Sequence, residues 1–277
     1  MPPVDEPFPG LTGCRVVVTG GTRGIGAGIA RGFLRAGAQV LVCGRGEPAT
    51  LPAAGDGTAV FTRADVRDPE QARRLIATGA EIFGGVDVVI SNAGGSPPAE
   101  AATASPRFHA KIIELNLIAP LHVAQAAHEV MQAQPGGGSI IFIGSVSGAR
   151  PSPGTAAYGA AKAGLHHLAT SLAIEWAPRI RVNTVVPGFV ATESAAEHYA
   201  GKADPASGPD GPASGADGGA DGVAAVAATV PLQRMATPDD IADACLFLAS
   251  PRAAYVSGAS LTLHGGGEPP AFLSARP

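Results

Sequence analysis

The sequence is poor in cysteine, in aromatic residues and in charge of either sign. Its three cysteines (Cys14, Cys43, Cys245) are odd in number and far apart, which excludes a disulfide framework and a cysteine zinc site. This usage indicates a reducing cytoplasm. Aromatic residues make up only 5% of the chain, and the net charge is −4 with histidines neutral. We therefore expect no basic surface that would hold nucleic acid or an anionic membrane.

Long hydrophobic runs are also missing, and we expect no targeting signal. No apolar run reaches the length of a membrane span, and the N-terminus MPPVDEPFPG has acids and prolines where a leader has basic and then apolar residues. Hydrophobic residues nevertheless make up 45% of the chain, which is enough for a substantial core. We expect a soluble cytoplasmic protein with one domain over residues 1–277 and a flexible N-terminal arm over residues 1–10.

Apolar runs rich in β-branched residues alternate with amphipathic segments along the chain. We expect strands at 16–18, 39–43, 59–62, 86–90, 139–143, 180–186 and 260–263, and helices at 27–36, 69–83, 110–132, 156–176 and 238–248. Residues 46–58 are predicted to form a polar connection. The alternation predicts a single-domain α/β fold, a Rossmann-type doubly wound parallel sheet of about seven strands flanked by helices on both faces.

A glycine-rich turn, Thr19-Gly20-Gly21-Thr22-Arg23-Gly24-Ile25-Gly26, joins the first strand to the first helix. Glycines let the backbone turn tightly and approach a pyrophosphate, whose charge lies at the helix N-terminus. The spacing Gly-x-x-x-Gly-x-Gly is weak evidence alone. Because it follows a strand and opens a helix, it indicates a dinucleotide site.

The end of the second strand bears on which dinucleotide is bound. A site that prefers NAD(H) places an acid near this point to hold the ribose 2′-hydroxyl. This chain has Gly44 there, followed by Arg45, with Arg23 in the glycine turn. Guanidinium groups match the geometry of a 2′-phosphate, so we predict NADP(H), with NAD(H) as the alternative. The competing interpretation is two solvated arginines.

Three residues between positions 145 and 162 carry the candidate chemistry. Tyr158 and Lys162 are four residues apart, so a helix places them on one face. An ammonium group one turn away favours the phenolate and lowers the pKa of Tyr158, which makes it a usable acid and base. Ser145 follows an apolar strand and could hydrogen-bond a substrate oxygen. The competing interpretation is a helix with a surface lysine and a half-buried tyrosine.

Residues 193–222 are rich in Gly, Ala, Asp and Pro and almost free of large apolar groups. We predict a low-complexity substrate-loop insertion whose middle, about residues 201–222, is mobile. Its aspartates invite a calcium interpretation, but their irregular spacing favours a flexible polar insertion. The seven histidines show no metal-ligand spacing, and His166 and His167, being adjacent, point apart on a helix. We expect each histidine to be satisfied or exposed, and no metal.

Taken in order, these motifs resemble the short-chain dehydrogenase/reductase family, in the line of β-ketoacyl carrier-protein reductases and bacterial keto- and hydroxysteroid reductases. The matching motifs are the glycine turn at 19–26, Asp65-Val66, SNAG at 91–94, Asn116, Ser145, Tyr158-x-x-x-Lys162, Asn183-x-x-x-Pro187-Gly188, Thr192, PDDIA at 238–242, FLAS at 247–250 and Ser257-Gly258. They span roughly residues 11–267, so the resemblance covers almost the whole chain.

The resemblance implies a catalytic set of Asn116, Ser145, Tyr158 and Lys162. Tyr158 would donate a proton to the carbonyl oxygen, Lys162 would lower its pKa and hold the nicotinamide ribose, Ser145 would orient the carbonyl, and Asn116 would hold a proton-relaying water. The implied cofactor contacts are Gly20, Thr22, Arg23, Gly24, Ile25 and Gly26 at the phosphates, Arg45, Asp65 and Val66 at the adenosine, Asn92, Ala93 and Gly94 on the ribose side, Tyr158 and Lys162, and Pro187, Gly188, Val190 and Thr192 at the nicotinamide.

The same resemblance implies an oligomer, and the chain departs from the family pattern at three positions. Relatives commonly form homotetramers, or else homodimers, by pairing the helices at 110–132 and 156–176. Gly144 replaces a second serine of many relatives and Ser91 replaces an asparagine, both of which we expect to be mild. His264 replaces the usual aspartate before the terminal glycines, which puts local contacts there in doubt.

The expected function is NADPH-dependent reduction of a ketone or 3-oxoacyl group to the alcohol, reversible as an alcohol dehydrogenase. The alternatives are an NAD-dependent hydroxy or hydroxysteroid dehydrogenase working oxidatively, and a nucleotide-binding protein without catalysis. Relatives of the last kind typically lose the tyrosine or the lysine, and this chain keeps both. The sequence leaves the substrate open among carrier-bound acyl groups, acyl-CoA, steroids, polyketides and small ketones.

Overall fold

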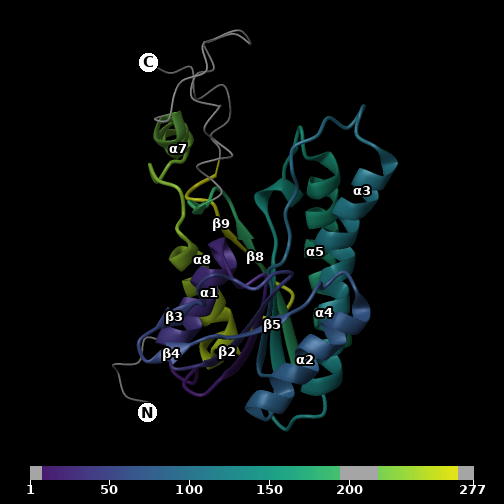
Figure 1. The fold of residues 1–277 in the computed structure, drawn as a ribbon, viewed down its shortest axis with the longest axis vertical. Coiled ribbons are helices and arrows are strands. Elements are labelled where there is room, and N and C mark those ends of the chain that lie inside the picture. The colour runs from purple at the N-terminus through teal and green to yellow at the C-terminus, as the bar shows by residue number, and fades with distance from the viewer. Residues whose placement is uncertain (1–7, 194–217, 268–277) are drawn as a thin grey trace.

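Seven parallel strands form one sheet in the computed structural model, which describes residues 8–193 and 218–267 (Figure 1). The strand order is β5-β2-β1-β6-β7-β8-β9, and every neighbouring pair is parallel. The strands are β1 (Arg15–Thr19), β2 (Gln39–Gly44), β5 (Val60–Arg63), β6 (Val88–Ser91), β7 (Gly138–Ile143), β8 (Ile180–Pro187) and β9 (Ser260–Leu263). The predicted doubly wound sheet is confirmed.

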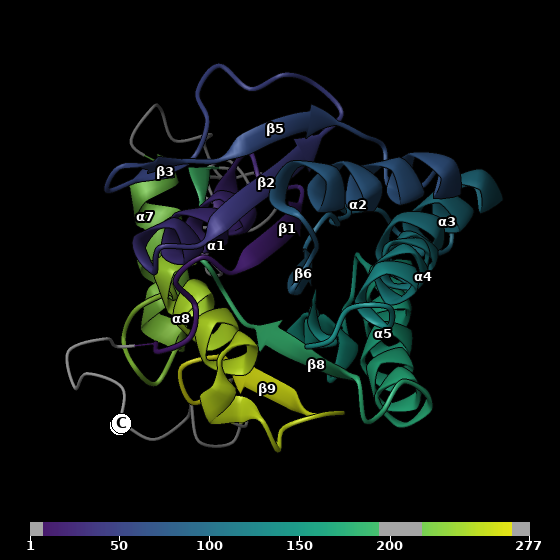
Figure 2. The ribbon, with the colours of Figure 1, turned by 90° about the horizontal axis from the view of Figure 1, so that it is seen from below.

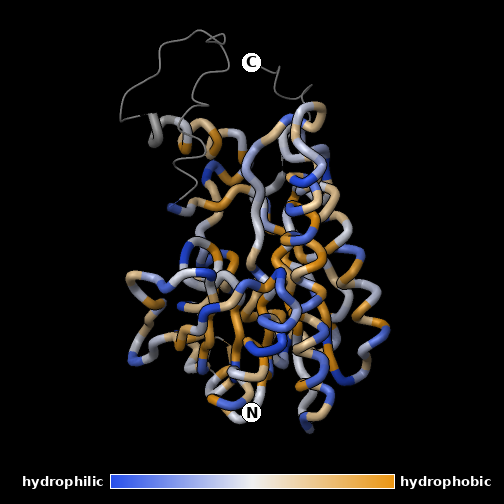
Figure 3. Tube along the Cα trace, turned by 45° about the vertical axis from the view of Figure 1, so that its right-hand side comes forward, coloured by the Kyte–Doolittle hydropathy of each residue, from blue (hydrophilic) through white to orange (hydrophobic). Residues whose placement is uncertain are grey.

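Helices cover the two faces of the sheet (Figure 2). On one face lie α1 (Gly24–Arg35) and α8 (Pro238–Ala249), and on the other lie α2 (Pro69–Phe83), α4 (Ala119–Met131) and α5 (Ala156–Glu175). Successive side chains of a strand point to opposite faces. Accordingly, Val16 and Val18 join the core under α1 and α8, whereas Val17 joins the core under α2, α4 and α5. Figure 3 shows how hydrophobic and hydrophilic stretches alternate along the described trace.

The predicted helix at 110–132 is instead three elements, and it begins four residues earlier. Helix α3 (Pro106–Ile113) starts behind Ser105, whose hydroxyl accepts from the Phe108 amide, with proline at the first helical position. A π-helical turn, η1 (Glu114–Ile118), then leads into α4. Its cause is Asn116, whose side-chain nitrogen donates to the Ile112 carbonyl that the α-helical backbone would otherwise use.

Three further segments differ from the sequence-based expectation. The predicted connection 46–58 contains a small antiparallel hairpin, β3 (Ala53–Ala54) and β4 (Gly57–Thr58), which turns at Gly55 with positive φ. Helix α7 (Gly218–Thr229) takes up residues 218–222 of the range predicted as mobile, because the alanine-rich stretch behind them favours a helix. Residues 194–217 and 1–7 lie outside the described ranges, and Phe8 of the predicted arm packs against the core beneath α1 and α8.

The strand order reverses between β1 and β6, and this reversal positions the site. Open parallel sheets bind ligands at the carboxyl ends of the strands on either side of such a switch point. Here the two strand ends are bonded together: the Asn92 and Ala93 amides donate to Thr19 Oγ1, each at 3.0 Å, and Asn92 Nδ2 donates to the Thr19 carbonyl at 2.9 Å. Within the described ranges, no helix is long and apolar enough to cross a membrane.

Candidate active site

A cleft of about 830 Å³ opens at the carboxyl edge of the sheet, above the switch point. With the exception of Asn116 and Val190, the residues predicted from sequence all line it. These are Gly20, Thr22, Arg23, Gly24, Ile25, Gly26, Arg45, Asp65, Val66, Asn92, Ala93, Gly94, Ser145, Tyr158, Lys162, Pro187, Gly188 and Thr192. The fold thus brings segments that lie between Gly20 and Thr192 in the sequence to one cavity. Val190 instead packs in the core beneath α1 and α8 and is 9% exposed, so its cofactor contact stays a prediction.

The glycine turn forms a cradle that side chains would fill. A Cβ atom at Gly26 would lie 2.3 Å from the Gly20 carbonyl oxygen. A Cβ atom at Gly20 would lie 3.1 Å from Ala93 Cα, and the φ of Gly20 is +61°, which favours glycine. Arg23 stands at the N-cap of α1 and caps it with no side-chain hydrogen bond. The first amides of that helix therefore face the cleft without an intrahelical partner, which fits a pyrophosphate.

Positive charge gathers at the adenosine end of the cleft. Asp65 is held by Arg67, whose Nε donates to Asp65 Oδ1 at 3.0 Å, and this partner lowers the pKa of the carboxyl group. Arg23 and Arg45 form no ion pair with any residue in the described ranges. Glu47 also lines this end. The residues present therefore fit a nucleotide, and the two arginines are available to its phosphates.

Lys162 is a buried ammonium group at the base of the cleft, only 3% exposed. Its Nζ donates to the Ile143 carbonyl at 2.8 Å, beyond the end of β7, and lies 5.6 Å from the centre of the Tyr158 ring. Burial lowers the pKa of Lys162 to about 8, because desolvation disfavours the charged form. Tyr158 and Lys162 do share one face of α5, as their spacing predicts.

The expected lowering of the Tyr158 pKa is wrong for this structure. Burial raises the pKa of the phenol, and a hydrogen bond with Ser145 opposes the rise only in part. Desolvation of the phenolate is thus the dominant effect on the Tyr158 pKa, and the charge of Lys162 is disfavoured by burial in the same way. Ser145 nevertheless meets Tyr158, and its Oγ also accepts from the Ser147 amide at 3.2 Å, at the start of the short helix η2 (Val146–Gly148). Its predicted hydrogen bond to a substrate oxygen stays a prediction.

Asn116 is fully buried and acts on the loop after β6. Its Oδ1 accepts from the Gly95 amide and its Nδ2 donates to the Gly95 carbonyl, both at 2.9 Å. Nδ2 also donates to Ile112, so both amide hydrogens are used. The side chain therefore anchors the Gly94–Gly95 wall of the cleft, and its predicted hold on a water molecule stays a prediction.

The sequence-based reading missed His166. This side chain lies one turn beyond Lys162 on α5, and its Nε2 accepts from the Ser145 amide at 3.4 Å. The four-residue spacing from Lys162 was the available signal, but a lone histidine on a helix carries little information without the strand end that meets it. Within the described ranges, no cluster of three His, Cys, Asp or Glu side chains could hold a metal ion.

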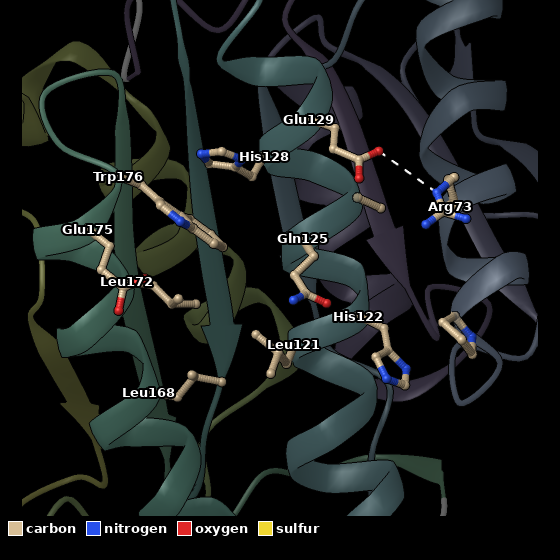
Figure 4. A pocket seen from close by; sticks show the side chains of 12 residues that line it. Arg73, Leu121, His122, Gln125, His128, Glu129, Leu168, Leu172, Glu175 and Trp176 are labelled. Carbon is tan, nitrogen blue, oxygen red and sulfur yellow. Dashed lines mark ion pairs between the residues drawn. The ribbon is translucent and has the colours of Figure 1, made fainter.

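A second hollow, of about 640 Å³, lies on the outer surface between α2, α4 and α5 (Figure 4). Leu121, His128 and Trp176 line it, and the His128 and Trp176 rings lie 4.7 Å apart. His122 Nδ1 is buried there without a hydrogen-bond partner among the described residues. None of the predicted site residues borders this hollow, which is separate from the cleft at the strand ends.

Known proteins are similar to this chain in sequence and in fold over almost its full length. Residues 20–268 match the family model described as enoyl-(acyl carrier protein) reductase. L-rhamnose 1-dehydrogenase (NAD(P)(+)) of Azotobacter vinelandii is 35% identical over 261 residues, 91% of this chain and 95% of the relative. A 3α-hydroxysteroid dehydrogenase of Mediterraneibacter gnavus is 33% identical over 257 residues, 90% of this chain and 94% of the relative.

Among solved structures, the ligand-free aldohexose dehydrogenase of Thermoplasma acidophilum superposes with a TM-score of 0.83 at 26% identity, over 98% of this chain and 97% of that one. The solved structure agrees with the doubly wound parallel sheet, and the family model and the relatives agree on the class of reaction. They identify an oxidoreductase that uses a nicotinamide cofactor and acts on an alcohol or ketone. The chain belongs to the short-chain dehydrogenase/reductase family.

Proposed function

We propose that the protein reduces a ketone or 3-oxoacyl group to the alcohol with NADPH, and reverses the reaction as an alcohol dehydrogenase. The observation that carries this proposal is the contact of Ser145 with Tyr158 above the buried Lys162, in the same cleft as the glycine cradle. A hydroxyl and a phenol that meet at one point can both address one carbonyl oxygen. The nicotinamide, when bound, supplies the hydride.

Each side chain then has a distinct task in the reduction. Ser145 orients the carbonyl by donating a hydrogen bond to its oxygen. Tyr158, whose raised pKa keeps the phenol protonated at neutral pH, donates the proton to that oxygen as the alcohol forms. The Lys162 ammonium group then stabilises the phenolate left behind. In the oxidative direction Tyr158 takes up the alcohol proton instead.

NADP(H) is the proposed cofactor because of the charges at the adenosine end. Arg23 and Arg45 line the cleft, and no described residue pairs with either of them. Asp65, the acid nearest the strand ends, is already engaged by Arg67. A ribose 2′-phosphate would find guanidinium donors there and no competing free carboxylate at Gly44. NAD(H) remains the alternative, since the rhamnose relative uses either cofactor by its name.

We also propose that the chain assembles into a homotetramer, or a homodimer, through the outer faces of α4 and α5. Helix α5 carries apolar residues almost all round, and Ile174 on its outer side is 82% exposed. The hollow between α2, α4 and α5, with its unpartnered His122 nitrogen, lies on the same surface (Figure 4). Light scattering of the purified protein tests this, and a monomer mass would contradict it.

The proposed chemistry is tested by NADPH oxidation against a carbonyl panel that includes acetoacetyl-CoA, a 3-oxosteroid and small ketones, repeated with NADH. We expect turnover that prefers NADPH. Tyr158→Phe removes only the acidic hydroxyl and should lower kcat at least about a thousandfold while NADPH still binds. The matched control is Tyr255→Phe, since Tyr255 is fully exposed outside the cleft. Full activity of Tyr158→Phe would overturn the assignment.

A further inference from the structure

His166 extends the catalytic face of α5 by one more turn. Tyr158, Lys162 and His166 succeed one another at intervals of four residues, so all three side chains point toward the end of β7. There the Ser145 backbone amide donates to His166 Nε2 at 3.4 Å. The imidazole is half-buried, and it contacts the backbone of the residue whose hydroxyl meets Tyr158.

Two glycines make room for this ring. A Cβ atom at Gly144 would lie 2.4 Å from His166 Nε2, and one at Gly148 would lie 2.9 Å from His166 Cε1. At Gly144 the ring is the nearest obstacle, so a side chain there would displace the imidazole; at Gly148 a Cβ atom would meet the α5 backbone first, 2.6 Å from the Ala163 nitrogen. The absence of a second serine at 144 is therefore matched to the presence of a ring at 166.

We infer that His166 is a positioning residue for the reaction proposed above: its imidazole holds the Ser145 backbone so that the hydroxyl faces Tyr158, and Gly144 admits the ring. The expected effect of His166 on the reaction rate rests on the proposed function. The positioning of Ser145 by His166 rests on the contacts alone. Neither the catalytic set nor the cofactor contacts predicted from sequence include this histidine.

The contact fixes the protonation state that His166 needs. Nε2 can accept from the Ser145 amide only when it carries no hydrogen, so the working form is the neutral ring protonated at Nδ1. Burial and the Lys162 charge both lower the pKa of His166, which keeps it neutral at pH 7. β7 and η2 face it with Ser145 and with backbone, β8 with Thr184, and Tyr158 is uncharged. The other charged or titratable side chains on the elements that contact α5 are Arg107, His109, Lys111, Glu114 and Arg181, and burial lowers the pKa of the Arg181 guanidinium.

Two substitutions of His166 distinguish the effect of its hydrogen-bond acceptor from the effect of its protonation. His166→Leu should lower kcat about tenfold, the worth of one lost hydrogen bond, while the dissociation constant for NADPH stays within about twofold. His166→Gln offers an amide oxygen that accepts but does not titrate. It should restore kcat at pH 7 and abolish the loss of rate that the wild type shows as pH falls below the His166 pKa. His167→Leu, which changes an exposed neighbour on the same helix, is the control.

A double-mutant cycle tests the match between positions 144 and 166. Gly144→Ala should lower kcat about tenfold and lower the melting temperature in the wild-type background. In the His166→Ala background the same change should have little effect on either, because the ring that it displaces is gone. Additive effects in both readouts would contradict the inference.

Two outcomes distinguish the failure of this inference from the failure of the proposed function. If the wild type turns over but folded His166→Leu keeps its kcat and pH profile, His166 has no positioning role. If the wild type binds NADPH but reduces no carbonyl, the proposed function fails and the contact is judged by NMR. The Ser145 amide shift should then titrate with pH in the wild type and stay constant in His166→Gln. A shift that titrates in neither would overturn the contact as well.

Discussion

The two ends of the cleft are built from different materials. The nucleotide end is backbone: glycines that let strand ends and a helix N-terminus close together, with Gly26 so tight that a Cβ would lie 2.3 Å from the Gly20 carbonyl. The catalytic end is side chains: Tyr158 and Lys162 on one helix face, met by Ser145 at the end of β7. The nucleotide end leaves no room for side-chain atoms at Gly26. The catalytic end instead holds a phenol and an ammonium group at fixed positions and removes them from water.

This difference decides how each end can fail. At the nucleotide end any added atom displaces backbone, so small substitutions should act through geometry and show little pH dependence. At the catalytic end the buried Lys162 charge carries a desolvation cost, and burial raises the pKa of Tyr158. Substitutions there should act through protonation and leave the cradle intact.

The largest effect on cofactor binding is expected from one methyl group in the cradle. Gly26→Ala would place Cβ 2.3 Å from the Gly20 carbonyl oxygen and 2.5 Å from Asn92 Nδ2. Because both are backbone or backbone-bonded atoms, the turn must open, and NADPH affinity should fall at least about a hundredfold. Fluorescence titration of NADPH measures this.

Gly46→Ala is the matched control, because Gly46 lines the same cleft but a Cβ atom there meets nothing within 4 Å. Its NADPH affinity should equal that of the wild type. If both variants bound NADPH normally, the nucleotide end would not depend on excluded atoms, and the contrast between the two ends would fail.

The same contrast explains what the sequence could predict. The cradle is local, so the spacing of Gly20, Gly24 and Gly26 after a β-branched run was enough to predict it, and the seven parallel strands followed from alternation. The four-residue spacing was enough to place Tyr158 and Lys162 on one face, but the role of Asn116 needed the family resemblance. The meeting of Ser145 with Tyr158 depends on the packing of α5 against β8 and η2. The direction of the Tyr158 pKa shift depends on burial, which no spacing reveals.

The errors have the same origin. Asn116 interrupts a helix because its side chain takes the Ile112 carbonyl and clamps Gly95, and the second of these contacts is long-range. The role of His166 is invisible in the sequence because the Ser145 amide that donates to its ring lies twenty-one residues away. The composition of residues 218–222 predicts a mobile insertion, whereas the structure places them in the first turn of α7, ahead of the helix-forming alanines.

An intermediate effect is expected on stability at the catalytic end. The pKa of Lys162 falls from 10.5 to about 8 on folding, so between those values the unfolded chain binds more protons and stability rises with pH. The full shift corresponds to about 3 kcal/mol. Relative to Lys162→Met, the wild type should therefore gain unfolding free energy as pH is raised from 7 to 10, measured by urea unfolding.

Lys111→Met, which removes an exposed lysine from α3, controls for the loss of one positive charge. A wild type that lost stability over this range relative to Lys162→Met would show that burial of the ammonium group does not disfavour its charge. The catalytic end would then resemble the nucleotide end, with geometry alone at work.

The smallest effect is expected at the adenosine end of the cleft, where a side chain, Arg45, adds to a site otherwise built from backbone. Arg45→Ala removes a guanidinium that no described residue pairs with, so the fold loses nothing, and only a ligand phosphate loses a partner. NADPH affinity should fall about tenfold while NADH affinity stays constant. Arg63→Ala is the control, since Arg63 pairs in register with Gly44 on the neighbouring strand yet lies outside the cleft. Equal losses for both cofactors would show that Arg45 supports the adenosine end structurally, and unchanged affinity for both would remove the charge argument for NADPH.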